Sequence, residues 1–244
     1  TVENGMTNAG KINLMGDNDS SVLTLAGTIN NSGTIYLDTD NGPSGGTITR
    51  SGTLTGTKLV NTGVIEADLT GAASALHLLN VDIDNTGTIN IFTNTQFAET
   101  EGSDFPTLVT TDGTISISSG KDFEMLGTMV VGADTNLNGS GTLVLGDQSS
   151  FKVVSGETFA IGNSGGSLSS ANVKFEGQAF INGTGVLAVE QTTTFQTLEV
   201  SNGASLVNSD SLSGTNFAID TEGEVSNAGT ISLTGGSLSI AGSL

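Results

Sequence analysis

The chain has 244 residues, of which 35 are glycine, and it carries a formal net charge of −19 at pH 7 with only six lysine and arginine residues. This charge opposes binding to nucleic-acid phosphates and to anionic membrane surfaces, so we expect no nucleic-acid partner. No stretch approaches the roughly 20 apolar residues of a membrane-spanning helix, so we expect no membrane insertion.

The composition favours β-structure. Valine, isoleucine and leucine alternate with threonine, serine and asparagine, which is typical of strands and tight turns. Hydrophobic residues make up 35% of the chain, a low share for a globule but enough for a thin, elongated core. The absence of cysteine excludes disulfides and zinc–thiolate sites and is compatible with an extracellular protein. We therefore expect one all-β domain over residues 1–244.

A short phrase of the form Asn-x-Gly-Thr-Ile-x-Leu recurs along the chain. Its copies occupy residues 8–14, 31–37, 61–67, 85–91, 111–117, 139–145, 183–189 and 227–233. Successive copies begin about 23 to 30 residues apart, except for two gaps of about 44 residues. Repeats of this length are typical of solenoids, in which each repeat forms one coil.

Each copy of the phrase predicts a turn followed by a strand. The asparagine and glycine suit a tight turn, and the next residues alternate so that Ile35 and Leu37 point inward and Tyr36 outward. Further strand-like segments suggest three strands per coil. The prediction is a parallel β-helix of about ten coils of roughly 22–28 residues, and at ~4.8 Å per coil the rod would be ~50 Å long.

The asparagine of the phrase has two interpretations. Asn31, Asn61, Asn85 and Asn227 could stack inside the corner of the coil as a ladder of side-chain amides, as in other stacked β-structures. Alternatively, asparagine is present only because it favours the turn. The sequence leaves both open.

These Asn-x-Gly-Thr-Ile phrases resemble the passenger regions of bacterial autotransporters and filamentous-haemagglutinin-type adhesins, over nearly the whole chain. The resemblance implies a right-handed parallel β-helix, export to the cell surface or beyond, and a role in adhesion or matrix building. It implies no catalytic residues. The chain lacks the translocator barrel of such proteins, which suggests a segment of a longer protein or another kind of surface assembly.

Residues for catalysis are sparse in the sequence. His77, the single histidine, lies in an apolar run without a nucleophile motif beside it, so we expect a structural role. Polysaccharide-cleaving β-helices are the enzymatic alternative, but the six cationic residues are scattered and no carboxylate pair stands out. We therefore expect no enzyme activity and no organic cofactor.

Calcium is the one ion that the sequence suggests. Asp17 and Asp19 lie in one acidic turn, and Asp38 and Asp40 lie in another, so each turn gathers oxygen ligands. Neither turn matches a complete calcium-loop motif, and solvated acidic turns are the alternative interpretation.

The ends of the repeat array suggest how the protein assembles. The first phrase begins at Asn8 and the last residues are strand-like, without an obvious polar cap at either end. We expect a homopolymer built by end-to-end stacking, or continuation in a longer chain. The main alternatives are an adhesin segment that binds a host or matrix glycan and a carbohydrate-cleaving enzyme; neither the receptor nor the glycan follows from the sequence.

Overall fold

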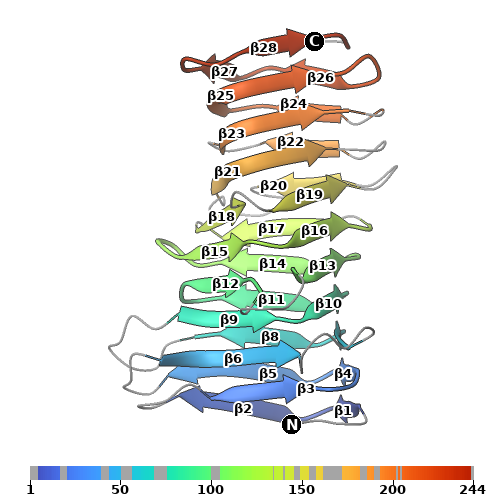
Figure 1. Cartoon of the computed structure of the whole chain (residues 1–244), viewed down its shortest axis with the longest axis vertical. Helices are drawn as coiled ribbons and strands as arrows, with labels where there is room; N and C mark the ends of the chain where they lie inside the picture. The colour runs from blue at the N-terminus through green and yellow to red at the C-terminus, as the bar shows by residue number, and fades with distance from the viewer. Residues whose placement is uncertain are drawn as a thin grey trace.

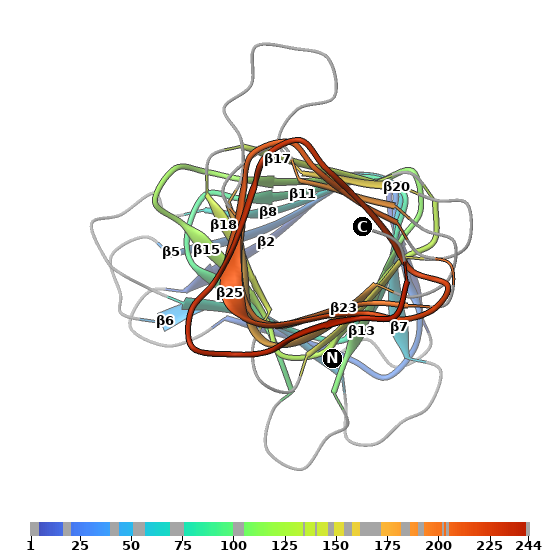
Figure 2. The ribbon, with the colours of Figure 1, turned by 90° about the horizontal axis from the view of Figure 1, so that it is seen from above.

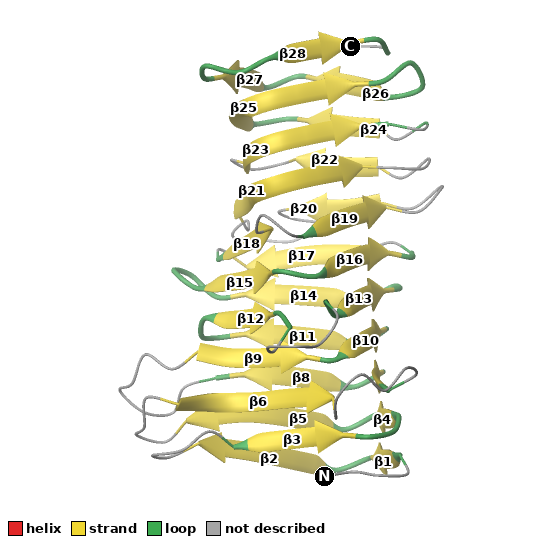
Figure 3. Ribbon diagram, in the orientation of Figure 1, coloured by secondary structure: helices red, strands yellow, loops and turns green. Residues whose placement is uncertain are grey.

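The computed structural model describes residues 5–16, 21–39, 44–50, 57–68, 76–99, 105–133, 135–139, 141–145, 149–153, 158–161, 172–181, 186–189, 193–201, 203 and 205–242. Within these ranges the chain consists of strands and turns, and no residue is helical (Figure 3). The turns of the chain stack along one axis, with the N-terminus at the bottom and the C-terminus at the top (Figure 1).

The described strands form three parallel sheets. The first sheet contains β1 (Met6–Asn8), β4 (Ile29–Asn31), β7 (Lys58–Asn61), β10 (Asp82–Asn85), β13 (Thr107–Thr110), β16 (Thr128–Val131) and β19 (Ser150–Val153). The second sheet contains β2 (Lys11–Gly16), β5 (Thr34–Thr39), β8 (Val64–Ala67), β11 (Thr88–Ile91), β14 (Thr114–Ile117), β17 (Thr135–Gly139), β20 (Thr158–Ile161), β22 (Val186–Val189), β24 (Ser205–Asn208) and β26 (Glu224–Asn227).

The third sheet contains β3 (Val22–Leu25), β6 (Ser44–Arg50), β9 (Leu76–Asn80), β12 (Thr95–Phe97), β15 (Asp122–Met125), β18 (Thr142–Leu145), β21 (Asn172–Ile181), β23 (Thr193–Val200), β25 (Ser211–Ile219) and β27 (Thr230–Leu233). The short β28 (Leu238–Ile240) also pairs with β25. Seen along the axis, the strands of the three sheets surround one interior (Figure 2), and the buried apolar side chains form a core cluster. The predicted all-β parallel solenoid is confirmed.

Like residues stack on like along the core. On the second sheet, Ile35 pairs with Ile12 in the turn before it and with Ile65 in the turn after it. The column continues through Ile89, Ile115 and Leu137. Each fully buried aliphatic side chain of this kind contributes about 1.5–3 kcal/mol. Ile35 and Leu37 are buried as predicted, while Tyr36 between them is only half-buried on the outer face.

The prediction of about ten coils is too high for a coil of three strands. In the described part of the chain, seven turns, from β1 to β21, contain one strand from each sheet. After β19 the first sheet ends, and the long strands β21, β23 and β25 take over part of its path.

The long strands replace two short strands with one. The pairing of β23 with β25 skips one residue on each strand, between Phe195↔Gly214 and Thr197↔Asn216, which indicates a bend in the middle. The first half of β25 pairs with β27 and the second half with β28. Consequently Asn208 and Asn227, which occupy equivalent positions in successive turns, are only 19 residues apart.

The repeat phrase does not mark one fixed side of the coil. The first five copies form strands of the second sheet, from β2 to β14. The copies at 139–145 and 227–233 instead form β18 and β27 of the third sheet. Spacing between phrases therefore does not equal the length of a turn where the phrase moves to another sheet. The predicted number of coils is too high because, among the described strands, the first sheet ends at β19.

Candidate functional site

The predicted calcium ligands are only partly described. Asp17, Asp19 and Asp40 lie outside the described residues, so the two acidic turns keep their status as a prediction. Asp38 lies in β5 with 4% of its surface exposed. Among the described residues, no group of three His, Cys, Asp or Glu side chains is placed to hold a metal ion.

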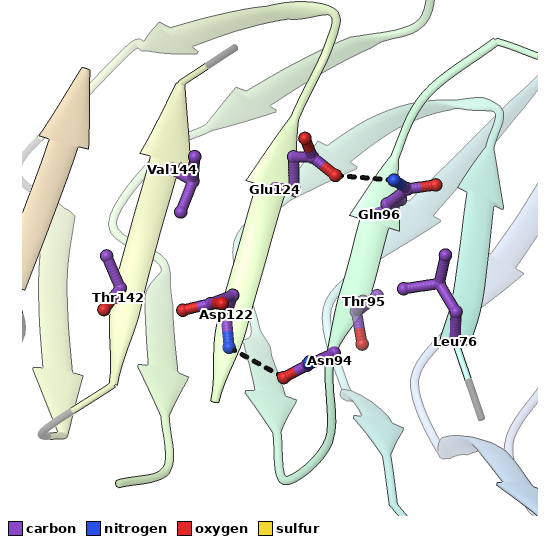
Figure 4. Close-up of a pocket in the computed structure, with 8 residues that line it drawn as sticks. All are labelled: Leu76, Asn94, Thr95, Gln96, Asp122, Glu124, Thr142 and Val144. Carbon is purple, nitrogen blue, oxygen red and sulfur yellow. Dashed lines mark hydrogen bonds between the residues drawn. The ribbon is translucent and has the colours of Figure 1, made fainter. Parts of the chain in front are cut away.

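A shallow depression lies on the outer face of the third sheet (Figure 4). Its volume is about 320 Å³, and it is lined by Leu76, Asn94, Thr95, Gln96, Asp122, Glu124, Thr142 and Val144. The side chains come from β9, β12, β15 and β18 and from the turn before β12. Two hydrogen bonds cross it: Gln96 Nε2 donates to Glu124 Oε2 at 2.5 Å, and the Asp122 backbone N–H donates to Asn94 Oδ1 at 3.1 Å.

The lining of this depression favours a structural role. The amide of Gln96 and the carboxylate of Glu124 already bind each other across neighbouring strands. The lining includes no aromatic ring on which a sugar could stack and no cation that could bind an acidic sugar. The depression therefore gives little support to glycan binding or to carbohydrate cleavage.

His77, in β9, is a polar side chain buried on the inner side of the third sheet. The backbone N–H of Gly46 donates to its Nδ1 at 2.8 Å, and its Nε2 lies 2.8 Å from the carbonyl oxygen of Asp68. A carbonyl can only accept, so Nε2 carries the proton and Nδ1 does not. His77 is fully buried and joins strand β6 to the segment after β8. It has the structural role that the sequence predicted.

Burial lowers the pKa of the His77 imidazole below its ordinary value. The hydrogen bonds to the backbones of Asp68 and Gly46 and the charges of Asp38 and Asp68 act in the opposite direction but do not outweigh burial. Protonation would also place an Nδ1–H against the Gly46 N–H donor. The fold is thus built for a neutral histidine.

We expect the stability of the protein to fall as the pH drops below about 6.5, the pKa of an unfolded histidine. Below that pH, His77 binds a proton in the unfolded chain more readily than in the folded chain. The free energy of unfolding therefore has its full value above that pH and declines below it. Urea unfolding at pH 7.5 and pH 5.5 measures the effect, with His77→Gln as the control without a titrating ring. An equal pH dependence of both proteins would contradict this explanation.

Tyr36 and Asp68 form a second polar contact on the outer face of the second sheet. The Tyr36 hydroxyl donates to Asp68 Oδ2 at 2.8 Å, and Lys11 Nζ lies 4.2 Å from the centre of the Tyr36 ring. Burial, this hydrogen bond and nearby carboxylates raise the pKa of Tyr36. Burial, and then the charge of Asp68, raise the pKa of Glu66. This contact links the first three turns.

The asparagines of the repeat phrase form a buried ladder at one corner. Asn8 Nδ2 donates to Asn31 Oδ1, Asn31 Nδ2 to Asn61 Oδ1, and Asn61 Nδ2 to Asn85 Oδ1, each at 2.7 Å. Each of these first three amides also donates to a backbone carbonyl of the next turn, at 3.1–3.3 Å. Of the two interpretations of these asparagines, the inward ladder is therefore the right one.

The ladder changes chemistry further along the stack. Thr110 pairs in register with Asn85, and the Thr135 hydroxyl donates to the Thr110 hydroxyl at 3.3 Å. A second asparagine ladder then begins at Asn208, whose Nδ2 donates to Asn227 Oδ1 at 2.7 Å. Asn208 Oδ1 is buried without a hydrogen-bond partner because its register partner in the preceding turn is Val189, which has no donor to offer.

Both ladders have the same direction. In every step the amide nitrogen of one turn donates to the amide oxygen of the turn nearer the C-terminus. The backbone bonds beside the ladders have the opposite direction, since Gly33 N–H donates to the carbonyl of Asn8 and Gly229 N–H to that of Asn208, at 3.0 and 3.2 Å. Each ladder asparagine thus presents its amide oxygen toward the N-terminal end and its amide nitrogen toward the C-terminal end, while the glycine N–H beside it points toward the N-terminal end.

Comparison with known proteins gives no relative for this arrangement. No protein-family model, curated protein or solved structure matches the chain. In the described part of the chain, no helix has the length and apolar character needed to cross a membrane. The likeness to adhesin passenger regions rests on the repeat phrase.

Proposed function

We propose that this chain is a non-enzymatic, extracellular or cell-surface β-solenoid with a structural or adhesive role. Its turns are extended at the ends, either by a second copy stacked end to end or by further turns of a longer chain. We take the coil to be right-handed, as about 98% of parallel crossover connections are.

The observation that carries this proposal is the use of the buried polar groups. The side-chain amides of the first ladder bond one turn to the next, through Asn8, Asn31, Asn61 and Asn85. His77 likewise uses both ring nitrogens to tie neighbouring segments together. Buried hydrogen bonds between successive turns stabilise an elongated rod. The negative charge of its surface repels neighbouring rods.

Negative-stain electron microscopy with and without calcium tests the proposal. We expect filaments one coil wide and much longer than the ~50 Å of a single rod. If calcium bridges the acidic surfaces of neighbouring filaments, its addition should gather them into bundles. Single rods at every protein concentration would contradict end-to-end stacking of this chain. In that case the rod could be extended only by further turns of a longer chain.

A further inference from the structure

The two end turns of the rod resemble each other in sequence but not in orientation. Asn8 ends β1 and lies at the corner between the first and second sheets. Asn227 ends β26 and lies at the corner between the second and third sheets. If one copy were stacked on another with each sheet above its own counterpart, these two corners would not meet.

The inward-facing residues of the two end turns follow the same order. In the C-terminal turn they are Val225, Asn227, Ile231, Leu233, Leu238 and Ile240; in the N-terminal turn they are Met6, Asn8, Ile12, Leu14, Leu23 and Leu25. Leu238 and Ile240 pair in register with the buried Phe217 and Ile219, which places them on the inner side of the wall. The two turns thus match as successive turns of one stack do.

The C-terminal turn leaves apolar surface uncovered. Leu238 and Ile240 are 53% and 43% exposed, although they continue core columns. A hollow of about 680 Å³ opens beside them, lined by Phe217, Glu224, Val225, Ser226, Asn227, Ile231, Leu233 and Leu238. The N-terminal turn presents Met6, Ile12 and Leu23, which are partly buried and packed against the core. Covering these residues removes apolar area from water at both ends.

The polar groups at the two ends are complementary as well. Asn227 Nδ2 donates to the carbonyl of Gly229 at 3.2 Å, as the amides of Asn31 and Asn61 do within their own turns. By the direction of the ladder, this nitrogen faces the C-terminal end. At the other end, Asn8 Oδ1 accepts the backbone N–H of Gly10 at 3.1 Å. In the next turn the equivalent N–H, that of Gly33, donates instead to the backbone carbonyl of the preceding asparagine. The Gly10 bond therefore substitutes for a bond to a preceding turn.

We propose that the N-terminal turn of a second copy stacks on the C-terminal turn after rotation by one side of the three-sided coil. In this arrangement β1 of the second copy pairs with β26, β2 with β27, and β3 with β28. Asn227 Nδ2 donates to Asn8 Oδ1 of the second copy, and the freed N–H of Gly10 donates to the carbonyl of Asn227. The inference rests on the proposed end-to-end assembly and adds its direction and rotation: the filament is polar, and each subunit is turned by one side relative to the last.

Engineered cysteines test the rotation directly, because the chain contains no cysteine of its own. Thr7, Lys11 and Ser226 are all exposed and outward-facing, so their substitution leaves the core unchanged. The rotated arrangement places Thr7 of one copy beside Ser226 of another, within reach of a disulfide. Stacking without rotation places β2 on β26 in the register of the second sheet, whose outward column runs from Lys11 to Ser226. It therefore brings Lys11, not Thr7, beside Ser226.

We expect mild oxidation of the double variant T7C/S226C to give a series of covalent multimers that a reductant dissolves. The matched variant K11C/S226C should stay monomeric on the same denaturing gel. Cross-linking of K11C/S226C instead would overturn the rotation while leaving end-to-end assembly intact. Filaments by microscopy without cross-linking of either variant would overturn the strand pairing. Single rods by microscopy, with neither variant cross-linked, would contradict the proposed assembly itself.

Discussion

Replacing Gly63 with alanine is expected to lower the free energy of unfolding by about 3 kcal/mol and to leave little folded protein at 37 °C. A Cβ at this position would lie 2.1 Å from the carbonyl oxygen of Gly33 and 2.7 Å from the carbonyl carbon of Ser32. Both are backbone atoms, and the turns that carry them are held by the bonds from Gly63 N–H to Asn31 and from Val64 N–H to Gly33. The clash can be relieved only by separating two turns.

The matched control is Gly10→Ala, because no atom lies within 4 Å of a Cβ built at Gly10. Gly10 occupies the same place in the phrase but belongs to the first turn of the column. Urea unfolding followed by circular dichroism should show a large loss of stability for Gly63→Ala and almost none for Gly10→Ala. Similar midpoints for the two variants would show that the turns are not packed as closely as described.

Replacing Asn31 with alanine is expected to cost about 2–4 kcal/mol, because it interrupts the ladder in its middle. Asn31 is buried, accepts from Asn8, and donates to Asn61 at 2.7 Å. Its loss leaves the Asn8 amide nitrogen and the Asn61 amide oxygen each without one buried partner. An unsatisfied buried polar group costs about 1–3 kcal/mol.

Asn30→Ala provides the comparison for this variant. Asn30 is the neighbouring residue on β4, but its side chain is exposed on the outer face. The two variants make the same chemical change one residue apart, so β-propensity and solubility are matched. Thermal unfolding should distinguish them clearly, and equal melting temperatures would contradict the energetic importance of the ladder.

Much of the fold follows from the repeat phrase. The phrase specifies a turn and a strand, and its recurrence specifies how successive turns stack. Asparagine and glycine specify the turn, and the alternation after them specifies which residues point inward, as Ile35, Tyr36 and Leu37 show. The in-register stacking of the phrase also brings Gly33 beneath Gly63. These features depend on residues within one short segment and on its copy in the next turn.

The orientation of the phrase around the coil could not be predicted, because one corner of the coil is chemically like another. Asn31 and Asn227 make the same amide bonds at different corners. The sequence likewise does not show that β25 replaces two short strands, because only the length of the strand distinguishes it. Within the last gap between phrases, the ladder asparagine lies in Asn208-Ser209-Asp210, where aspartate stands in the place of the phrase's glycine.

The contacts of the polar residues were harder to anticipate than the fold. Nothing in the spacing of Tyr36, Asp68 and His77 indicates that Asp68 meets the other two. His77 bonds to backbone atoms of Gly46 and Asp68, and Tyr36 bonds to the Asp68 side chain across turns. The threonines that continue the ladder, Thr110 and Thr135, likewise lack the phrase's asparagine. Such partners are set by the length of the loops, which the turn chemistry does not determine.

The unequal length of the turns has a consequence for how the rod would respond to mechanical force. Each turn is bonded chiefly to its two neighbours, so a pulled rod would peel from an end one turn at a time. The separation of ladder partners is 19 residues at the C-terminal end and 30 between Asn31 and Asn61. At ~3.5 Å per extended residue, these turns would release ~65 Å and ~105 Å of slack. A tether built in this way lengthens in steps and absorbs tension before its last attachment fails.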